Sequence, residues 1–589
     1  MPDEDSSQGP PREGADLVIE GVKLLNVFTR EAYEASIALG GGMVLDVGPV
    51  EDLVGPSTKV IDGRGLYAAP GFIDGHVHLE SSHLTLAGFV EAALPHGTTS
   101  AVFDPHELAN VAGRLGVEAL MKEAEALPFS PFFTVPSCVP SAPGLETSGA
   151  ELSLSDVEAL LAKPSVVGLA EVMDYLGVLK RSPGLMRKVE ASRRLGKVVD
   201  GHCPGLRGRL LASYLAAGPS SDHEALSGEE AVEKLRLGAW VMVREGSATK
   251  CLDEVLKAVL KQGLDTSRLM IVTDDLDPRD LALGYLEARL KRAVELGMEP
   301  IEAVRLVTLN PSTYFRLERA AGAIAPGWRA DLLLLRDLVS FKPLYVIVGG
   351  EVAAYEGGLL QSIPKRRYPE PLHRSVKLPT AFPSGLAIKA EGEAGRVRAR
   401  VIKVRDGSLV TEAGEAELKV VNGLVHPSPD EDVLQLAVVE RHGRTGGVGL
   451  GFISGMGLRE GAVATTYAHD AHNAVAAGAS WEDMAKALRR LEELQGGVAV
   501  VSRGRVLAEL RLEVAGLMSY DPPMEVAKAL VGVEEALRSL GCKLTKPLQT
   551  LSFVALPVIP RLKLTDRGLI DVESGAFVSP ILHQSPHSP

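Results

Sequence analysis

Cysteines and long apolar runs are both scarce in this sequence, and each scarcity excludes a class of protein. The four cysteines, Cys138, Cys203, Cys251 and Cys542, are scattered over 589 residues with no CxxC or other close pair. A disulfide framework is therefore excluded, and a reducing cytoplasm fits the composition. No uninterrupted apolar stretch reaches the roughly 18–20 residues that a transmembrane helix needs, so the sequence predicts no membrane span.

Basic residues are not in excess either. The formal net charge is −14 at pH 7 and the isoelectric point is near 5.6, with no run rich in Lys and Arg. This charge argues against a nucleic acid or an anionic membrane surface as the partner, and it leaves small neutral substrates open. Residues 1–16 are acidic and rich in Pro, Gly and Ser, without the basic and apolar regions of a signal peptide, so we expect a disordered tail.

The chain is long enough for several domains. Its 589 residues, 46% of them apolar, suggest about three domains at roughly 100–200 residues each. Residues 17–67 contain short β-rich runs separated by Gly turns, and a similar pattern returns in residues 321–365, so we expect the two flanks to pair into one small β-sandwich domain. Residues 366–384, rich in Pro and basic residues, are typical of a linker. Residues 385–589 alternate strand-like and helical segments, as an α+β domain does.

Between the flanks, in residues 68–320, short apolar runs alternate with helical segments. Eight such runs are present, the sixth of them, PSSDH at 219–223, being the weakest. Several helical segments begin near Ser or Asp and end near Gly. Repeated β-then-α units over about 250 residues predict a (β/α)8 barrel of the TIM type, and the fold class is therefore α/β.

Nearly every apolar run of this region ends in a chemically capable side chain. In a barrel the C-terminal ends of the strands converge on one mouth, so residues that are far apart in the sequence gather there. In chain order the ends carry His76, His78, Asp104, His106, Ser137, Cys138, Glu171, His202, His223, Arg244, Glu245, Asp274 and Asp275.

Six of these residues suit a pair of divalent metal ions. His76 and His78 are separated by one residue, so on an extended strand both side chains point to the same side and can bind one ion. Glu171 can bridge two ions, and Asp274 would bind the first ion while accepting a proton from bound water. Two ions lower the pKa of a bridging water, so the implied reaction is hydrolysis by metal-activated hydroxide. Four imidazoles and two carboxylates favour Zn, Mn or Fe over Ca. The six residues are His76, His78, Glu171, His202, His223 and Asp274.

Each of these residues also has an ordinary structural explanation. A single histidine at a strand end is more often a hydrogen-bonded structural residue than a ligand. Glu171 could cap a helix, and Asp274 or Asp275 could serve in the turn before Pro278. It is the combination, in strand order at one barrel mouth, that favours a metal site.

Longer motifs in the sequence resemble one known family. HVHLESSHL, HGTTSAVFDPHELANVAG, GLAEVMDYLGV, DGHCPGLRGRLLASYLAAGPSSDHEAL and TDDLDPRDL, and further on ERHGRTGGVGLGFISGMGLREGAVATTYAHDAHN and LSFVALPVIPRLKLTDRGLIDV, are similar to the metal-dependent adenine deaminases of the amidohydrolase superfamily. The resemblance covers nearly all of the chain after the tail. It implies an amidohydrolase barrel with an additional C-terminal domain. It also implies hydrolysis of adenine to hypoxanthine and ammonia in purine salvage.

The resemblance also implies roles for individual residues. A binuclear Mn(II) or Fe(II) centre, with Zn(II) as an alternative, would lie on the six ligands, with Glu171 as the bridge. Asp104 and His106 of the DPHE motif would sit beside the metals and move protons, because the departing amino group must be protonated, and Asp274 could serve there too. A homodimer is expected from the resemblance alone. Candidates for recognising the purine ring, each of which could equally belong to a polar barrel rim, are Glu80, Arg244, Glu245, Ser247 and Asp275.

Two features do not follow directly from the family pattern. After TDD many family members carry a Gly–His pair, whereas this chain has Gly284 and Tyr285. If that histidine assists closure or proton transfer in relatives, its loss would tune or abolish activity here. The HDAHN motif, from His469 to Asn473, has three interpretations: another metal site, an edge of the active site that reaches over the barrel mouth, or a structural turn.

Two other functions stay open at this point. One is a different amidohydrolase, which would act on a cyclic amide or another aminopurine. The other is a purine- or metal-binding protein without turnover, which the Tyr285 substitution suggests. A zinc deaminase of the cytidine type is excluded, because the sequence lacks H-x-E followed by P-C-x-x-C.

Overall fold

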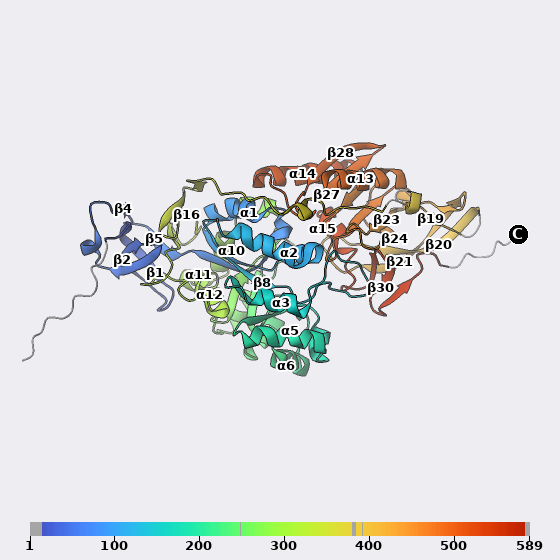
Figure 1. Cartoon of the computed structure of the whole chain (residues 1–589). Helices are drawn as coiled ribbons and strands as arrows, with labels where there is room; N and C mark the ends of the chain where they lie inside the picture. Colours follow the sequence, from blue (N-terminus) through green and yellow to red (C-terminus); the bar gives the residue numbers. More distant parts are fainter. Residues whose placement is uncertain (1–13, 248, 380–383, 391–392, 583–589) are drawn as a thin grey trace, which may run out of the picture.

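The structure, a computed structural model, describes residues 14–247, 249–379, 384–390 and 393–582. A small β domain, a barrel and a C-terminal domain follow one another along an elongated molecule (Figure 1). Residues 1–13 of the predicted tail lie outside the described residues. Ala15 is buried and donates its backbone N–H to Leu53, and Asp16 donates to Leu39. The small β domain therefore begins before residue 17.

The two flanks of the barrel pair into one continuous nine-stranded sheet, as the sequence predicts. Strand β5 joins them, because it pairs in parallel with β1 and antiparallel with β15, where Ala68 lies opposite Leu334. Alternate residues of the strands, such as Ile19, Ile37 and Leu332, form one buried apolar cluster. The strands are β1 (Leu17–Asn26), β2 (Glu31–Gly40), β3 (Met43–Gly48), β4 (Lys59–Asp62), β5 (Tyr67–Pro70), β15 (Leu332–Leu335), β16 (Pro343–Val348), β17 (Glu351–Tyr355) and β18 (Gly358–Leu359).

All eight apolar runs of the central region form parallel strands of a barrel. One hydrogen-bonded group has the order β10-β9-β8-β7-β6-β14 and the other β11-β12-β13. The Ser220 N–H bonds to the Val199 carbonyl between the groups, and Asp274 of β14 pairs opposite Val77 of β6, so the barrel closes. The strands are β6 (Phe72–His78), β7 (Thr98–Phe103), β8 (Ser130–Val135), β9 (Val166–Val172), β10 (Val198–Gly201), β11 (Ser221–Asp222), β12 (Trp240–Arg244), β13 (Leu269–Val272) and β14 (Asp274–Asp275).

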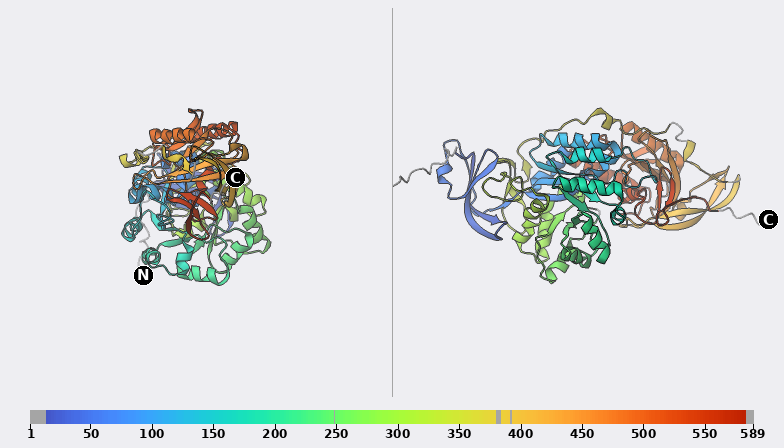
Figure 2. Two further views of the ribbon diagram at one scale, coloured as in Figure 1. Left: turned by 90° about the vertical axis from the view of Figure 1, so that its right-hand side faces the viewer. Right: turned by 60° about the horizontal axis from the view of Figure 1, so that its bottom comes forward.

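Helices alternate with these strands and cover the barrel (Figure 2). Their starts carry the caps that the sequence suggests: the Ser153 hydroxyl accepts from the Asp156 N–H, and the Ser227 hydroxyl accepts from the Glu230 N–H. The helices are α1 (Leu86–Ala93), α2 (His106–Ala124), α3 (Leu154–Leu161), α4 (Tyr175–Leu179), α5 (Pro183–Arg194), α6 (Gly208–Ala217), α7 (Gly228–Arg236), α8 (Leu252–Lys261), α9 (Pro278–Leu283), α10 (Leu286–Glu295), α11 (Pro300–Arg305) and α12 (Leu309–Phe315).

The C-terminal domain mixes sheet and helices. A ten-stranded sheet has the order β19-β22-β21-β20-β24-β23-β26-β25-β27-β28, and a three-stranded sheet follows it. The ten strands are β19 (Ile388–Lys389), β20 (Ala394–Lys403), β21 (Glu412–Val421), β22 (Leu424–Val425), β23 (Val433–Val439), β24 (Val448–Ser454), β25 (Ala462–Thr465), β26 (Ala474–Gly478), β27 (Gly497–Ser502) and β28 (Arg505–Arg511). The remaining elements are α13 (Trp481–Leu494), α14 (Pro523–Ser539), α15 (Pro547–Phe553), β29 (Leu562–Thr565), β30 (Gly568–Asp571) and β31 (Ala576–Val578).

The C-terminal domain is docked on the barrel by backbone and side-chain contacts. The Thr85 N–H bonds to the Ser519 carbonyl, and the Ser519 N–H bonds to the His83 carbonyl. Arg279 of α9 lies 2.8 Å from Glu534 of α14. The segment predicted as a linker, 366–384, contributes to this packing, because the buried Tyr368 hydroxyl donates to Glu123 of α2. These contacts place residues of the last domain beside the barrel mouth.

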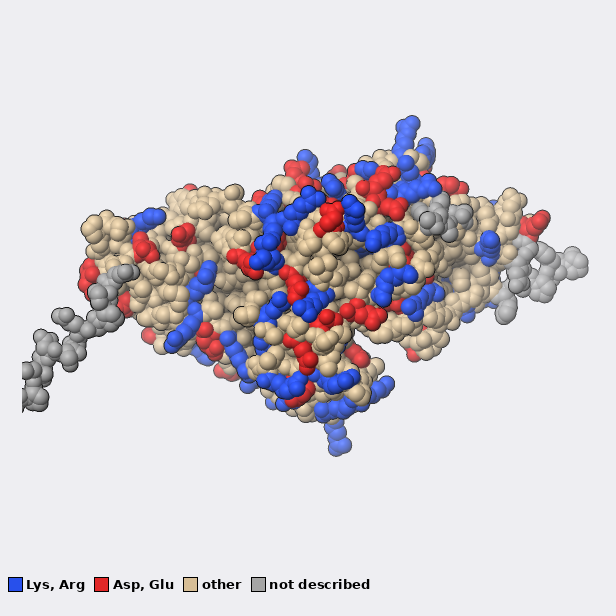
Figure 3. Space-filling model, in the orientation of Figure 1, with Lys and Arg blue, Asp and Glu red and all other residues tan. Residues whose placement is uncertain are grey.

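The surface charge and the character of the helices bear on the partners expected from the sequence. On the face drawn in Figure 3, acidic and basic side chains are interspersed over all three domains. Among the helices of the described residues, none has both the length and the apolar character required for a membrane crossing.

Candidate active site

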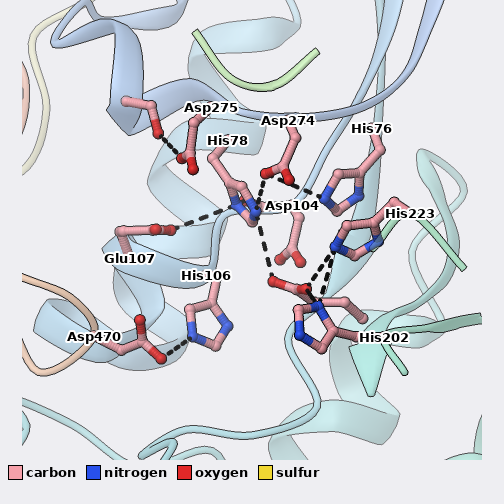
Figure 4. A network of polar contacts seen from close by, with 12 residues as sticks. His76, His78, Asp104, His106, Glu107, His202, His223, Asp274, Asp275 and Asp470 are labelled. Atoms are coloured by element: carbon pink, nitrogen blue, oxygen red, sulfur yellow. Dashed lines mark hydrogen bonds and ion pairs between the residues drawn. The ribbon is translucent and has the colours of Figure 1, made fainter. Parts of the chain in front are cut away.

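The six predicted metal ligands lie together at the C-terminal ends of the barrel strands. His76 and His78 end β6, Glu171 lies near the end of β9, and Asp274 is in β14 beside β6. His202 and His223 directly follow β10 and β11. Figure 4 shows five of these side chains, which come from distant parts of the sequence, pointing toward one another: His76, His78, His202, His223 and Asp274.

Glu171 contacts both halves of this cluster. Its Oε2 atom lies 2.9 Å from His202 Nδ1 and 3.0 Å from His223 Nε2. Its Oε1 atom lies 3.5 Å from His78 Nε2, which is also 3.1 Å from Asp274 Oδ1. One carboxylate therefore stands between two groups of nitrogen and oxygen donors, which is the position that a bridging ligand requires.

The donor atoms fit divalent metal ions. The groups His76, His78, Asp104 and Glu171, then His76, His223 and Asp274, and then Glu171, His202 and His223, each bring their donor atoms within 4.8 Å of one another. His76 Nε2 and both carboxylate oxygens of Asp104 are buried with no hydrogen-bond partner among the described residues. Imidazole and carboxylate donors together suit the divalent transition metals.

Neighbouring groups orient the histidines. His78 Nδ1 lies 3.1 Å from the Asp104 carbonyl, which can only accept, so Nδ1 carries the proton and Nε2 is left free to bind a cation. His202 Nδ1 and His223 Nε2 lie 3.2 Å apart, each close to Glu171. Two ring nitrogens facing each other at this distance need a shared proton or cation between them.

The charges of the cluster support its carboxylates in the ionised form. Burial by itself raises the pKa of Glu171, but hydrogen bonds and charges from His202 and His223 outweigh it and hold that pKa well below its usual range. Burial is likewise outweighed at Asp274, where the charge of Arg244 lowers the pKa. Burial, and then the neighbouring His223, lower the pKa of His76 well below its ordinary value. The cluster thus offers anionic oxygens and a neutral imidazole to a cation.

The two residues predicted to move protons lie beside this cluster. Both carboxylate oxygens of Asp104 are buried, and burial raises its pKa to about 7 despite the opposing charges of His78 and His106. The His106 ring lies 3.4 Å, from Nε2 to Oδ2, from Asp470 of the C-terminal domain. Burial lowers the pKa of His106, but the hydrogen bond and charge of Asp470 raise it well above its ordinary value overall.

The five residues predicted to recognise the substrate are not equivalent. Arg244 lies 2.6 Å from Asp274 and 2.9 Å from Asp275, so it holds both carboxylates at the mouth. Ser247 donates to Asp280 at 2.5 Å, and both Ser247 and Asp275 line a cavity above the mouth. Arg244, Asp275 and Ser247 therefore stay candidates for the substrate site.

The other two predicted recognition residues make structural contacts. Glu80 is buried and its Oε1 atom accepts from the Leu108 N–H, near the start of α2. Burial, and then the charge of Glu107, raise the pKa of Glu80 to about 8. Glu245 accepts from the Leu252 N–H at 3.0 Å and so caps α8. The structure does not bring Glu245 into the cluster.

Comparison with known proteins gives the family. The amidohydrolase family matches residues 67–353, and the adenine deaminase C-terminal domain matches residues 408–576. The adenine deaminase of Methanococcoides burtonii is 42% identical over 96% of this chain and 96% of its own length. The chain belongs to the adenine deaminase family. Adenine deaminase 1 of Carboxydothermus hydrogenoformans is 41% identical over 97% of this chain and 96% of its own length, and the Moorella thermoacetica adenine deaminase is 42% identical over 95% and 94%.

The C-terminal domain of this adenine deaminase family member adds residues that the sequence analysis did not assign to the site. Tyr467 Oη lies 2.9 Å from Ser81 Oγ, and His469 Nδ1 lies 3.2 Å from Glu107. Glu107 in turn lies 3.6 Å from His78 Nδ1. The HDAHN motif was the available signal for His469 and Asp470. Glu107 ends the DPHE motif, whose pattern indicated roles for Asp104 and His106 alone, and no pattern singled out Tyr467.

The interpretation of HDAHN as a further metal site fits the structure poorly. Glu107, His469 and His472 bring donor atoms within 4.8 Å of one another. However, His472 Nδ1 accepts from the Ala468 N–H, and burial lowers the pKa of His472 well below its ordinary value. A neutral ring that accepts at Nδ1 carries its proton at Nε2, which then has no lone pair for a metal. The motif instead combines an edge of the site with a structural turn.

Tyr285, the position at which the sequence departs from the expected family pattern, lies in the core. Its side chain is fully buried and its ring packs edge-on against Phe89. The hydroxyl donates to Asp74 Oδ2 at 2.8 Å, and Asp74 Oδ1 accepts from the His76 N–H. Tyr285 therefore supports the strand that carries the first two ligand candidates and does not itself line the cluster.

Proposed function

We propose that this chain hydrolyses adenine to hypoxanthine and ammonia at the barrel mouth. The observation that carries the proposal is the convergence of Glu171 with four histidines and Asp274, in a chain that matches adenine deaminases over nearly its full length. The same full-length match, including the C-terminal domain, disfavours an amidohydrolase that acts on a cyclic amide.

A binuclear divalent centre is part of this proposal. We assign the ligands as His76, His78, Glu171, His202, His223 and Asp274, with Mn(II) or Fe(II) as the metal and Zn(II) as the alternative, on the strength of the mixed nitrogen and oxygen donors. When bound, such a centre supplies an activated water at neutral pH. Arg244 holds the Asp274 carboxylate so that one of its oxygens stays directed at His78.

Protons must move from the attacking water to the departing amino group. Water adds at C6 of adenine, the C6–N bond breaks, and the amino group leaves as ammonia, so one proton of water ends on ammonia and the other on N1 of hypoxanthine. Asp274 accepts the proton of the attacking water. Asp104 and His106 would deliver protons: burial raises the pKa of Asp104 to about 7, and Asp470 raises the pKa of His106 against the opposing effect of burial. These roles assign proton removal to Asp274 and proton delivery to Asp104 and His106.

Three further statements belong to the proposal. We propose that the enzyme works in the cytoplasm, which the four free cysteines support. We propose a role in purine salvage, because hydrolysis of a free base yields another usable purine. A homodimer is proposed from the family resemblance, and light scattering of the purified protein tests it.

Ammonia release from adenine by the Mn-loaded enzyme tests the function. We expect turnover of adenine, accompanied by loss of its absorbance band, and little release from cytosine or a cyclic amide. The Glu171→Gln variant should lose turnover, whereas Glu229→Gln, at an exposed position of α7, should keep it. An absorbance band that persists in the presence of bound adenine would show a binding protein, and turnover confined to a cyclic amide would show another amidohydrolase.

A further inference from the structure

A cavity lies between the barrel mouth and the C-terminal domain. Ser81 and Asp275 line it on the barrel side, and Tyr467, Gln549 and Phe553 line it on the side of the C-terminal domain. Its barrel wall adjoins the metal-ligand cluster, because Asp275 follows directly on the ligand candidate Asp274. One wall of the cavity therefore lies next to the ligand cluster, and the other wall is formed by the C-terminal domain.

The wall of the C-terminal domain is suited to a flat ring. The His469 and Phe553 rings are stacked, with centroids 4.5 Å apart and planes 23° apart, and Tyr467 packs edge-on against His469 with centroids 5.0 Å apart. All three side chains line the cavity. Nucleobases stack on aromatic side chains, and such stacking does not distinguish one base from another by hydrogen bonds to its edges.

Gln549 is the side chain of this wall that can form hydrogen bonds to the edge of a bound ring. It lies on α15 and is half-buried, and its amide has no hydrogen-bond partner among the described residues. Several other polar groups of the cavity are paired: Ser81 with Asp275 and Tyr467, and Lys546 with the Ser247 carbonyl. On the barrel side, His83 Nδ1 is buried and has no hydrogen-bond partner among the described residues. A primary amide presents two N–H donors and one carbonyl acceptor side by side.

We infer that Gln549 recognises the N3 and N9–H edge of the purine and so selects the free base. The inference rests on the proposed deamination of adenine. C6 of the substrate must face the ligand cluster for hydrolysis, so the opposite edge of the ring, N3 with N9–H, faces the C-terminal wall. The amide carbonyl of Gln549 then accepts from N9–H while its N–H donates to N3, a two-bond pairing of the kind that amide side chains make with adenine. A substituent on N9, as in a nucleoside, removes the donor and occupies the space of the amide.

Binding and kinetics of matched ligands test this assignment. For the Mn-loaded full chain, we expect Gln549→Ala to raise KM for adenine by about 5- to 100-fold, the loss expected for two neutral hydrogen bonds, with kcat changed much less. Wild type should bind 9-methyladenine more weakly than adenine, and Gln549→Ala should lose most of that discrimination. Gln262→Ala, which removes an exposed glutamine directly after α8, is the control and should change neither quantity.

The same experiment separates failure of this assignment from failure of the proposed function. Calorimetric binding of adenine, 9-methyladenine and hypoxanthine is measured on each protein alongside ammonia release. An enzyme that binds adenine and releases no ammonia refutes the proposed function, while the binding ratios still report on Gln549. Wild type that binds adenine and 9-methyladenine equally well overturns the assignment, and this measurement stands even if the variant does not fold. Unchanged adenine affinity in a folded Gln549→Ala variant overturns it as well.

Discussion

Lys234 of α7 provides a strong test of how the barrel holds its ligand candidates. The side chain is completely buried, and its Nζ atom lies 2.7 Å from Asp222 Oδ2 and 3.1 Å from the Cys203 carbonyl. Asp222 precedes His223, Cys203 follows His202, and Asp222 Oδ1 accepts from the Cys203 N–H. One ammonium group therefore ties together the two strand ends that carry these histidines.

The effect of Lys234→Met follows from the burial of its partners. Burial lowers the pKa of Lys234, but Asp222 and Glu230 outweigh it and keep the group charged, while the pKa of Asp222 lies below its ordinary value because Lys234 outweighs burial there. Removing one partner of a buried ion pair leaves the other charge unpaired and costs about 3–5 kcal/mol. For a domain of this size we expect Tm to fall by roughly 6–10 °C or more.

The assay combines thermal melting with metal analysis after dialysis. Lys257→Met is the matched control, because Lys257 forms a similar i,i+4 pair with Asp253, 3.0 Å apart, but with its side chain 60% exposed. The control should lose less than about 1 kcal/mol. Lys234→Met should also retain less metal than the control, because His202 and His223 lose their common support. A Lys234→Met protein with the Tm and metal content of the control would refute the reasoning.

Three further outcomes are expected. Glu171→Gln should reduce the metal content of the enzyme. It should also lower ammonia release by more than the roughly 10–100-fold that the loss of a residue behind the metal ligands costs. Full activity of this variant would contradict the role of Glu171 as the bridge. Tyr285→Phe removes the hydrogen bond to buried Asp74, so urea unfolding should show a loss of about 1–3 kcal/mol, and unchanged stability would contradict this. Burial, and then Asp470, raise the pKa of Glu146 from 4.5 to about 8. The stability that this protonated carboxyl contributes is complete below about pH 4.5 and is lost as the pH rises through 8. Glu146→Gln should therefore melt increasingly above wild type as the pH is raised across this range, and parallel Tm profiles would exclude the shift.

The barrel could be predicted because its signals are local. Each strand is a short apolar run, and the side chain at its C-terminal end is read directly from the sequence, as with His76 and His78 after the run in β6. Strand order then places these ends at one mouth. The pairing of the two flanking β segments was visible for the same reason, since both show strand patterns on either side of the barrel.

The contacts made by the C-terminal domain could not be predicted in this way. Tyr467 meets Ser81 across 386 positions, and no periodicity relates the two segments. The directions of adjacent side chains also could not be predicted from the sequence. The Arg244 side chain turns toward Asp274, whereas that of its neighbour Glu245 turns away and caps a helix. At Tyr285, the sequence shows a substitution within the family pattern but not that its hydroxyl reaches Asp74.

The strand that joins the two flanks has a consequence for synthesis on the ribosome. β5 pairs with β1 on one side and with β15 on the other, and the entire barrel is translated between β5 and β15. Until that late strand emerges, the nascent chain carries an open sheet edge with unsatisfied backbone groups, which is the kind of edge that recruits other chains. Rapid folding of the barrel brings the missing strand into place, so mutations that slow the barrel should first appear as aggregation of newly made protein.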